Sequence, residues 1–332
     1  MKNILYLFLI ILCACSTFDN RILVKNSGQA QGSYFHIQYL SENGENYKLQ
    51  IDSIFLEVDS SLSIYKEYSI ISKLNKGKDV KTDTLFNTVF RGAQKVFLES
   101  EGNFDCSVSP LVNAWGFYKD KLGDSLVIDS AKFRKILPYV GFDKIRLIAD
   151  SLVLPKGMSL DFNSIAQGYT VDVIAQFLLS KGDSNYLVEV GGELLAKGRN
   201  ADENIWRVGV DKPSEDIDIQ ERFQFILDLE DKALATSGNY RKFYEKDGVK
   251  YAHTINPFTG FPAQNRLLSV TVIHDNCMLA DAYATAFMVM GVRKSKQFAK
   301  AHSEIEIYLV YTGKEGAWKT FISPSMRKRI FN

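Results

Sequence analysis

An aspartate and a threonine interrupt an apolar segment near the C-terminal end of the chain. The segment reads CMLADAYATAFMVMG from Cys277 to Gly291, and its pattern predicts a buried helix. Asp281 and Thr285 are four residues apart, so a helix places them one turn apart on one face. Two oxygen ligands on one face suit a hard cation. An aspartate favoured by the helix dipole and a threonine within a core would give the same spacing, and the spacing alone favours that structural interpretation.

A second polar segment could supply the other side of such a site. Residues 160–172 read LDFNSIAQGYTVD, which predicts a short strand that breaks at Asn163 and Ser164 before a helix that opens near Gly168. A turn of this kind exposes amides to an anion or carbonyls to a cation. An ordinary tight turn between a strand and a helix would look the same.

Three more segments are rich in glycine or polar residues. In 188–198 (VEVGGELLAKG), Gly191 and Gly192 follow a predicted strand, where either a ligand or a β-bulge could be accommodated. The segments 102–117 (GNFDCSVSPLVNAWGF) and 252–262 (AHTINPFTGFP) read as loops, and the second contains a histidine among several candidate ligand contacts.

Composition and the first residues describe an exported globular protein. The chain has 332 residues, 46% of them apolar, and a net charge of +1, so no charge excess favours nucleic acid. MKNILYLFLIILCAC predicts a signal peptide at 1–14, and LCAC resembles a lipobox with cleavage before a lipid-bearing Cys15. A plain secretory signal is the alternative. We expect a tether at 15–27, a folded body at 28–332, and an anchored lipoprotein that faces the periplasm.

The remaining cysteines and histidines do not predict a zinc site. Cys106 and Cys277 are 171 positions apart, and buried free thiols are expected rather than a disulfide. No cluster of histidine and cysteine has zinc-ligand spacing.

Hydrophobic periodicity predicts helices and strands without strict alternation, which is an α+β pattern. The unit typical of a dinucleotide-binding fold, in which an early strand is followed by GxGxxG and a helix, is not found in the sequence. The expected helices cover 47–62, 84–100, 169–182 and 277–291, and the expected strands cover 33–40, 185–190, 206–210, 222–229, 267–273 and 304–312.

Six motifs together resemble the ApbE family of FAD:protein FMN transferases, over about residues 30 to 312. They stand in family order as FDCSVSPLVNAWGF, LDFNSIAQGYTVD, GGELLAKG, SGNY, HTINPFTGFP and ADAYATAFMVMG. The resemblance implies a single α+β domain related to the T-fold, with mixed sheets and flanking helices. It also implies Mg²⁺-dependent transfer of FMN from FAD to a threonine of an exported redox-complex subunit, with release of AMP.

The resemblance assigns roles to individual residues. Asp281, Thr285 and Ser164 would bind Mg²⁺, the last through its carbonyl, with Ala166 as the alternative, and His253 would be the base for the acceptor hydroxyl. Tyr65 would stack on the flavin ring. The other FAD contacts would be Phe104, Asp105, Asp161, Gln167, Asp172, Gly192, Thr259 and Gly260.

This chain departs from the family pattern at positions near the nucleotide. Gln167 stands in place of a frequent lysine, Asn256 in place of an aspartate and Ile70 in place of a glutamate, while Asn163 and Ser164 replace small glycine-type residues. Two other functions therefore remain open. One is an FAD pyrophosphatase that uses water in place of the acceptor hydroxyl, and the other is a flavin-binding lipoprotein without turnover.

Overall fold

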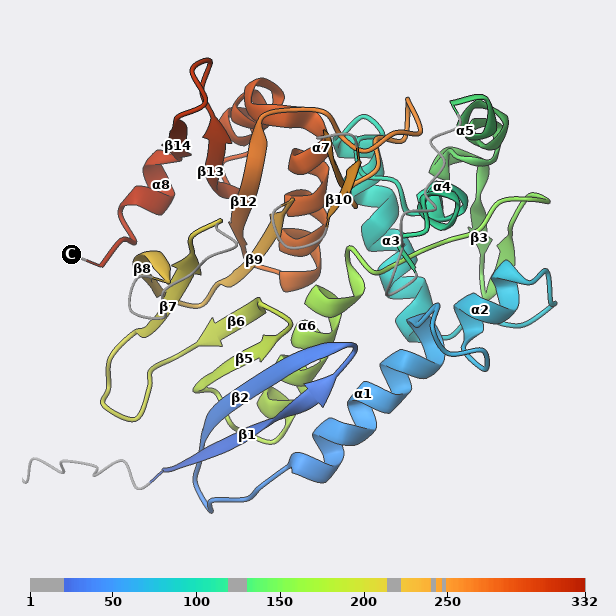
Figure 1. The fold of residues 1–332 in the computed structure, drawn as a ribbon. Helices are drawn as coiled ribbons and strands as arrows, with labels where there is room; N and C mark the ends of the chain where they lie inside the picture. The colour runs from blue at the N-terminus through green and yellow to red at the C-terminus, as the bar shows by residue number, and fades with distance from the viewer. Residues whose placement is uncertain (1–20, 119–129, 214–221, 240–242, 247–248, 332) are drawn as a thin grey trace, which may run out of the picture.

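One eight-stranded antiparallel sheet forms the centre of the protein (Figure 1). The computed structural model describes residues 21–118, 130–213, 222–239, 243–246 and 249–331. The sheet follows the order β1-β2-β5-β6-β9-β12-β13-β14. Its strands are β1 (Ile22–Ala30), β2 (Ser33–Ser41), β5 (Tyr186–Val190), β6 (Glu193–Lys197), β9 (Ala233–Gly238), β12 (Leu267–His274), β13 (Glu306–Thr312) and β14 (Trp318–Ile322).

Four long helices cover one face of this sheet, because alternate strand side chains point toward them. They are α1 (Lys48–Leu62), α3 (Thr84–Glu99), α6 (Ala166–Ser180) and α7 (Cys277–Ala301). Helices α3 and α7 share a core with Val270, Val272 and neighbouring strand residues. Helices α1 and α6 share a second core with β2 and β5. Helices α6 and α7 therefore lie next to each other over the middle of the sheet (Figure 1).

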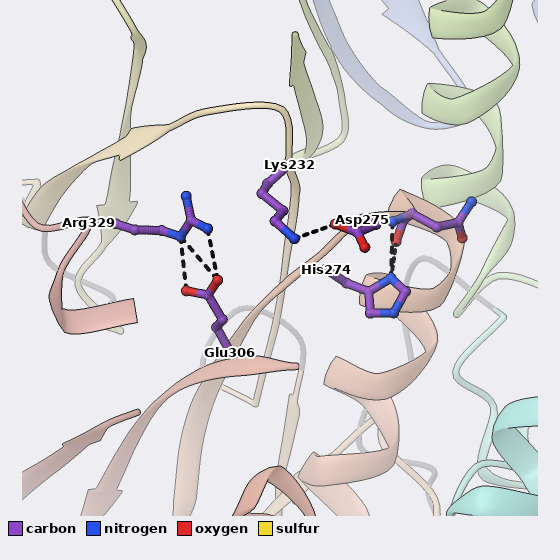
Figure 2. A network of polar contacts seen from close by, with 6 residues as sticks. Lys232, His274, Asp275, Glu306 and Arg329 are labelled. Carbon is purple, nitrogen blue, oxygen red and sulfur yellow. Dashed lines mark hydrogen bonds and ion pairs between the residues drawn. The ribbon is translucent and has the colours of Figure 1, made fainter. Parts of the chain in front are cut away.

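The opposite face is covered by the hairpin of β7 (Trp206–Asp211) and β8 (Phe223–Leu229), with α8 (Pro324–Arg327) beside it. The C-terminal residues close this face. Arg329 binds Glu306 with Nε–Oε2 and Nη2–Oε1 distances of 2.9 Å, as Figure 2 shows. The backbone of Arg329 also accepts a hydrogen bond from Asp228 N at 2.8 Å. The basic sequence at 326–329 is therefore a docked part of the fold and not a solvated tail.

The same figure shows how the start of α7 is held. Lys232 pairs with Asp275, and Asn276 N donates to His274 Nδ1 at 3.0 Å (Figure 2). Burial lowers the pKa of His274. Its imidazole is consequently a neutral acceptor that fixes the residues directly before the helix.

Short elements fill the space at the other end of the molecule. Some surround a small aromatic core that includes Trp115, and others, such as those that carry Ile71 and Phe142, pack in the main core. Trp115 stacks on Phe133 with ring centroids 4.4 Å apart. These elements are α2 (Ile70–Asn75), η1 (Cys106–Val108), α4 (Ser109–Trp115), α5 (Ser130–Ile136), η2 (Leu137–Tyr139), η3 (Phe142–Lys144), β3 (Arg146–Ile148), β4 (Ser151–Val153), β10 (Phe243–Lys246) and β11 (Val249–Ala252). Among the described residues, no helix is long and apolar enough to cross a membrane.

The α+β class and the expected long elements are confirmed, with several corrections. Residues 22–27 belong to β1, so the expected tether at 15–27 is too long, and Cys15 and the signal peptide lie outside the described residues. The expected loop at 102–117 contains η1 and α4, and residues 160–162 form no strand. All ladders of the large sheet are antiparallel, and both described cysteines are free and buried, as expected for the thiols.

The helix at 277–291 also differs from its prediction. The chain leaves helical geometry at Gly291, with φ 73° and ψ 173°, but resumes a helix that ends at Ala301. Asn265 Nδ2 donates to Met288 O at 2.7 Å and so satisfies one carbonyl that the break exposes. A glycine with positive φ is a typical helix end, and the sequence does not reveal that a second helix follows directly.

Candidate functional site

The site lies where the N-terminal turn of α6 meets the first turns of α7. Gly168 N donates to Asp281 Oδ2 at 3.2 Å, across 113 residues of sequence. The two helices approach so closely that a Cβ on Gly168 would lie 2.4 Å from Cys277 O. Only glycine permits this contact. The predicted proximity of Asp281 and the turn after residue 163 is therefore present in the structure.

Asp281 is a buried carboxylate with an unusual proton affinity. The residue is 6% exposed, and burial raises the pKa of its carboxyl group to about 7, while the bond from Gly168 lowers it slightly. A buried anion is unstable without a compensating charge. A bound cation would supply that charge and hold the carboxylate ionised.

Thr285 lies one turn further along α7, and its hydroxyl faces the end of β9. Thr285 Oγ1 is 3.2 Å from Ser237 Oγ. Ser237 belongs to the SGNY segment, whose Tyr240 lies outside the described residues. The face of α7 that carries the candidate metal ligands Asp281 and Thr285 is thus linked to β9 through this pair of hydroxyl groups.

The turn before α6 offers a backbone carbonyl as a third oxygen. In a regular helix Gly168 N would bond to Ser164 O, but here it donates to Asp281. The carbonyl of Ala166, the alternative ligand, already accepts from Thr170 Oγ1 at 2.8 Å. Ser164 is therefore the better candidate of the two.

These donors fit a hard cation. A carboxylate, a hydroxyl and a main-chain carbonyl are oxygen ligands of the type that Mg²⁺ binds, and three of them leave positions for substrate oxygens. In the part of the chain that the structure describes, no cluster of three or more His, Cys, Asp or Glu side chains could hold a metal ion. The donor set therefore favours Mg²⁺ over a zinc-type metal.

Asp172, a predicted FAD contact, has a structural position instead. Its Oδ1 accepts from Cys277 N and its Oδ2 from Met278 N, both at 2.9 Å. These amides are unsatisfied helix-start donors, so Asp172 stabilises the N-terminus of α7 from the neighbouring helix. Burial raises the pKa of its carboxyl group to about 6. Both oxygens are used inside the protein, which places Asp172 behind the site.

Phe104 and Asp105, two further predicted FAD contacts, are also internal. The Phe104 ring is 1% exposed within the main core. Asp105 Oδ1 accepts from Ser107 N at 2.7 Å and from Ser107 Oγ at 2.6 Å, and Oδ2 accepts from Phe142 N at 3.2 Å. Burial raises the pKa of Asp105. The contacts of both residues hold η1 and η3 together, and no exposed Phe104 ring is available to a flavin.

Asp161 and Tyr65 meet in a polar cluster that opens to solvent. The cluster also contains Tyr118 and Asn163, and Tyr118 OH donates to Asp161 Oδ2 at 2.7 Å. The ring of Tyr65, which is 63% exposed, meets the edge of Tyr118 at a centroid distance of 6.4 Å. An exposed aromatic ring beside buried polar groups is suited to stacking on a ligand. The sequence analysis does not single out Tyr118, because a lone tyrosine after a WGF motif gives no functional signal.

The loop at 253–262 carries His253, Thr259 and Gly260. His253 and Thr259 are exposed, whereas Gly260 is buried with a φ of +75°. Trp115 Nε1 donates to Gly260 O at 2.8 Å, so the indole of one motif holds the turn of another. Thr254 Oγ1 donates to Asn239 Oδ1 at 3.2 Å, which joins this loop to the end of β9. The loop that carries the candidate base and the face of α7 that carries the candidate metal ligands are thus both linked to β9.

Gln167 and the glycine turn at 191–192 lie together, although the sequence separates them. A Cβ on Gly191 would lie 2.5 Å from Gln167 Nε2. Gly192 has a φ of +107° and open space on its Cβ side. Two predicted FAD contacts, Gln167 and Gly192, are therefore neighbours at the tip of the β5–β6 hairpin.

The fold is an α+β fold, and its group of oxygen donors between two helices is a candidate site for a hard cation. Comparison with known proteins identifies the family. The chain belongs to the ApbE family, whose model matches residues 31–309.

Known relatives agree in sequence and in structure. The FAD:protein FMN transferase of Vibrio cholerae serotype O1 is 36% identical over 312 residues, which cover 91% of each chain. The solved structure of the flavin transferase ApbE from Vibrio cholerae matches with a TM-score of 0.83 at 33% identity, over 93% of this chain and 99% of that one. The apo form of the Pseudomonas stutzeri flavinyl transferase ApbE gives the same TM-score at 29% identity, over 93% and 97% of the two chains.

Proposed function

We propose that this chain transfers FMN from FAD to a threonine hydroxyl of an acceptor protein and releases AMP. The observation that carries the proposal is the contact of Asp281 with the turn that opens α6, which brings the candidate metal ligands together. The relatives that are named FAD:protein FMN transferases support the reaction type.

Asp281, Thr285 and the Ser164 carbonyl would hold Mg²⁺ in this proposal. When bound, the ion would neutralise the negative charge of the pyrophosphate as its bond breaks. The raised pKa of Asp281 supports this role, because a fully buried carboxylate gains most from a cation.

The acceptor threonine would approach from the side of the 253–262 loop. Its oxygen forms a bond to the phosphorus of the FMN half, and the bond from that phosphorus to the bridging oxygen breaks, so AMP leaves with that oxygen. His253 would take the hydroxyl proton. The exposure of His253 supports this role, since an acceptor protein must reach it from outside.

The flavin ring would lie on Tyr65, with Gln167 and Gly192 on the nucleotide side. We further propose that the protein is exported and anchored through a lipid on Cys15, with an exported redox-complex subunit as the acceptor. The lipobox-like LCAC supports the anchor.

A labelling assay tests the reaction. The chain without its signal peptide is incubated with FAD, MgCl₂ and a candidate acceptor domain, and in-gel flavin fluorescence and the acceptor mass are measured. A mass gain equal to one FMN is expected. Free FMN and AMP without labelling would indicate a pyrophosphatase, and intact bound FAD would indicate a carrier.

A further inference from the structure

Asn163 is an exposed residue in the turn before α6, and its side chain joins two groups of the candidate flavin site. Asn163 Nδ2 lies 3.2 Å from Tyr65 OH and 3.4 Å from Asp161 Oδ2. Its backbone amide donates to Asp161 Oδ1 at 2.8 Å. The amide group therefore connects a buried carboxylate to an exposed tyrosine 98 residues away.

Asp161 is the fixed point of this arrangement. It is 8% exposed, and its own backbone amide bonds to Cys106 O at 2.8 Å. Its Oδ1 accepts from the Asn163 backbone amide, and its Oδ2 accepts from Tyr118 OH and lies 3.4 Å from Asn163 Nδ2. Asn163 and Tyr118, which both contact Tyr65, are thus held by the same buried carboxylate.

The two contacts restrict Tyr65 in different ways. The Tyr118 ring meets the Tyr65 ring at 90°, which limits its tilt. The Asn163 amide binds the hydroxyl at the far end, which limits rotation of the side chain about its χ1 bond. A ring that is fixed before the ligand arrives loses less conformational entropy on binding.

We propose that Asn163 is a positioning residue for the flavin, which it orients by holding the Tyr65 hydroxyl. This inference rests on the proposed function, because it takes the ligand on Tyr65 to be the isoalloxazine of FAD. A residue with no side-chain amide at this position would remove the hydrogen bond to the Tyr65 hydroxyl and keep the Tyr118 contact.

The experiment is a double-mutant cycle on Asn163→Ala and Tyr65→Phe. The alanine variant keeps the backbone bond to Asp161, and Asn163 is exposed, so the variant is expected to fold. Loss of one hydrogen bond corresponds to about a 2- to 10-fold increase in the KM for FAD, with a smaller change in kcat. In the Tyr65→Phe background, Asn163→Ala should change the KM by less than about 2-fold, because the two residues act as one unit.

A spectroscopic signal separates positioning from general loss of stability. A tyrosine ring stacked on the isoalloxazine quenches flavin fluorescence, so bound FAD should be brighter in Asn163→Ala than in the wild type. Asn204→Ala is the matched control, since this exposed side-chain amide donates to the carbonyl of Asp202 in its own loop, which is remote in sequence from Asn163. It should leave both KM and quenching unchanged.

The outcomes are distinct for this inference and for the proposed function. An unchanged KM and unchanged quenching in Asn163→Ala, or purely additive effects in the double variant, would overturn the role of Asn163. A wild-type chain that neither binds FAD nor labels an acceptor would instead refute the proposed function itself.

Discussion

Replacement of Asp281 by asparagine should separate the metal role of this carboxylate from a structural one. Without a cation, an ionised Asp281 is costly because its pKa of about 7 in the folded protein lies above the ordinary value of an aspartate, about 3.9. A raised folded pKa means that the fold prefers the protonated acid. The stability that this preference provides is complete below about pH 4 and is lost as the pH rises through 7.

The size of this effect follows from the shift. Each pKa unit corresponds to about 1.4 kcal/mol, so the penalty on the metal-free wild type should grow by about 3 kcal/mol between pH 5 and pH 8. Asparagine keeps an oxygen for the Gly168 amide and carries no charge. Metal-free Asp281→Asn should therefore gain stability relative to the wild type over this interval, by roughly 4–5 °C in Tm for a chain of this length.

Differential scanning calorimetry on metal-free protein at both pH values, followed by a MgCl₂ titration, measures these quantities. Mg²⁺ should raise the Tm of the wild type at pH 8 but leave Asp281→Asn unchanged. Asp79→Asn, an exposed acid in a loop, serves as the control and should behave as the wild type. An equal Mg²⁺ response in Asp281→Asn, or no pH-dependent difference between the two proteins, would refute the assignment.

Three further substitutions test the neighbouring parts of the site. His253→Ala should lower the rate of flavin transfer by about 10²- to 10⁴-fold while the Kd for FAD stays within about 2-fold, which single-turnover labelling and FAD titration measure; a matching loss of FAD affinity would contradict a role as base. Asp172→Ala should lower the free energy of unfolding by about 1–3 kcal/mol, because two amides at the start of α7 lose their acceptor. Urea denaturation measures this, and a variant as stable as the wild type would disprove it. Asn256→Asp should change stability by less than about 0.5 kcal/mol and leave the labelling rate within about 2-fold, since either side chain can accept from Phe258 N and Thr259 N; a large gain in labelling would show that the missing charge matters.

The sequence predicts the long elements well because each carries its own periodic signal. Helices α1 and α3 begin and end within one residue of their predicted limits, since their apolar faces repeat over four turns. The sequence at 102–117 reads as a loop, although η1 and α4 lie there. Their stability comes from a local aromatic core that forms only after distant residues meet, and periodicity over seven residues cannot reveal it.

The candidate metal site shows a different limit. The spacing of Asp281 and Thr285 follows from helical geometry, but the pairing of Asp281 with Gly168 joins segments 113 residues apart. The six motifs taken together predict that pairing, whereas no local pattern of residues can predict it. Motifs also do not separate residues that touch a ligand from residues that hold the motif in place, and the contacts of Asp172 and Asp105 and the burial of Phe104 are of the second kind.

Three of the five residues that depart from the family pattern are neutral amides. The structure gives Asn163, Gln167 and Asn256 each a contact: with Tyr65, with the turn at Gly191, and with two amides of its own loop. At position 256 a single Oδ1 accepts both backbone bonds, so the turn itself requires an oxygen acceptor but no charge. At position 167 the family lysine would place a positive charge close to the nucleotide, and a glutamine cannot offset the charge of a pyrophosphate. In the proposed reaction more of that charge would be balanced by Mg²⁺ at Asp281, so we expect the labelling rate of this chain to depend more steeply on Mg²⁺ concentration than that of relatives that carry the lysine.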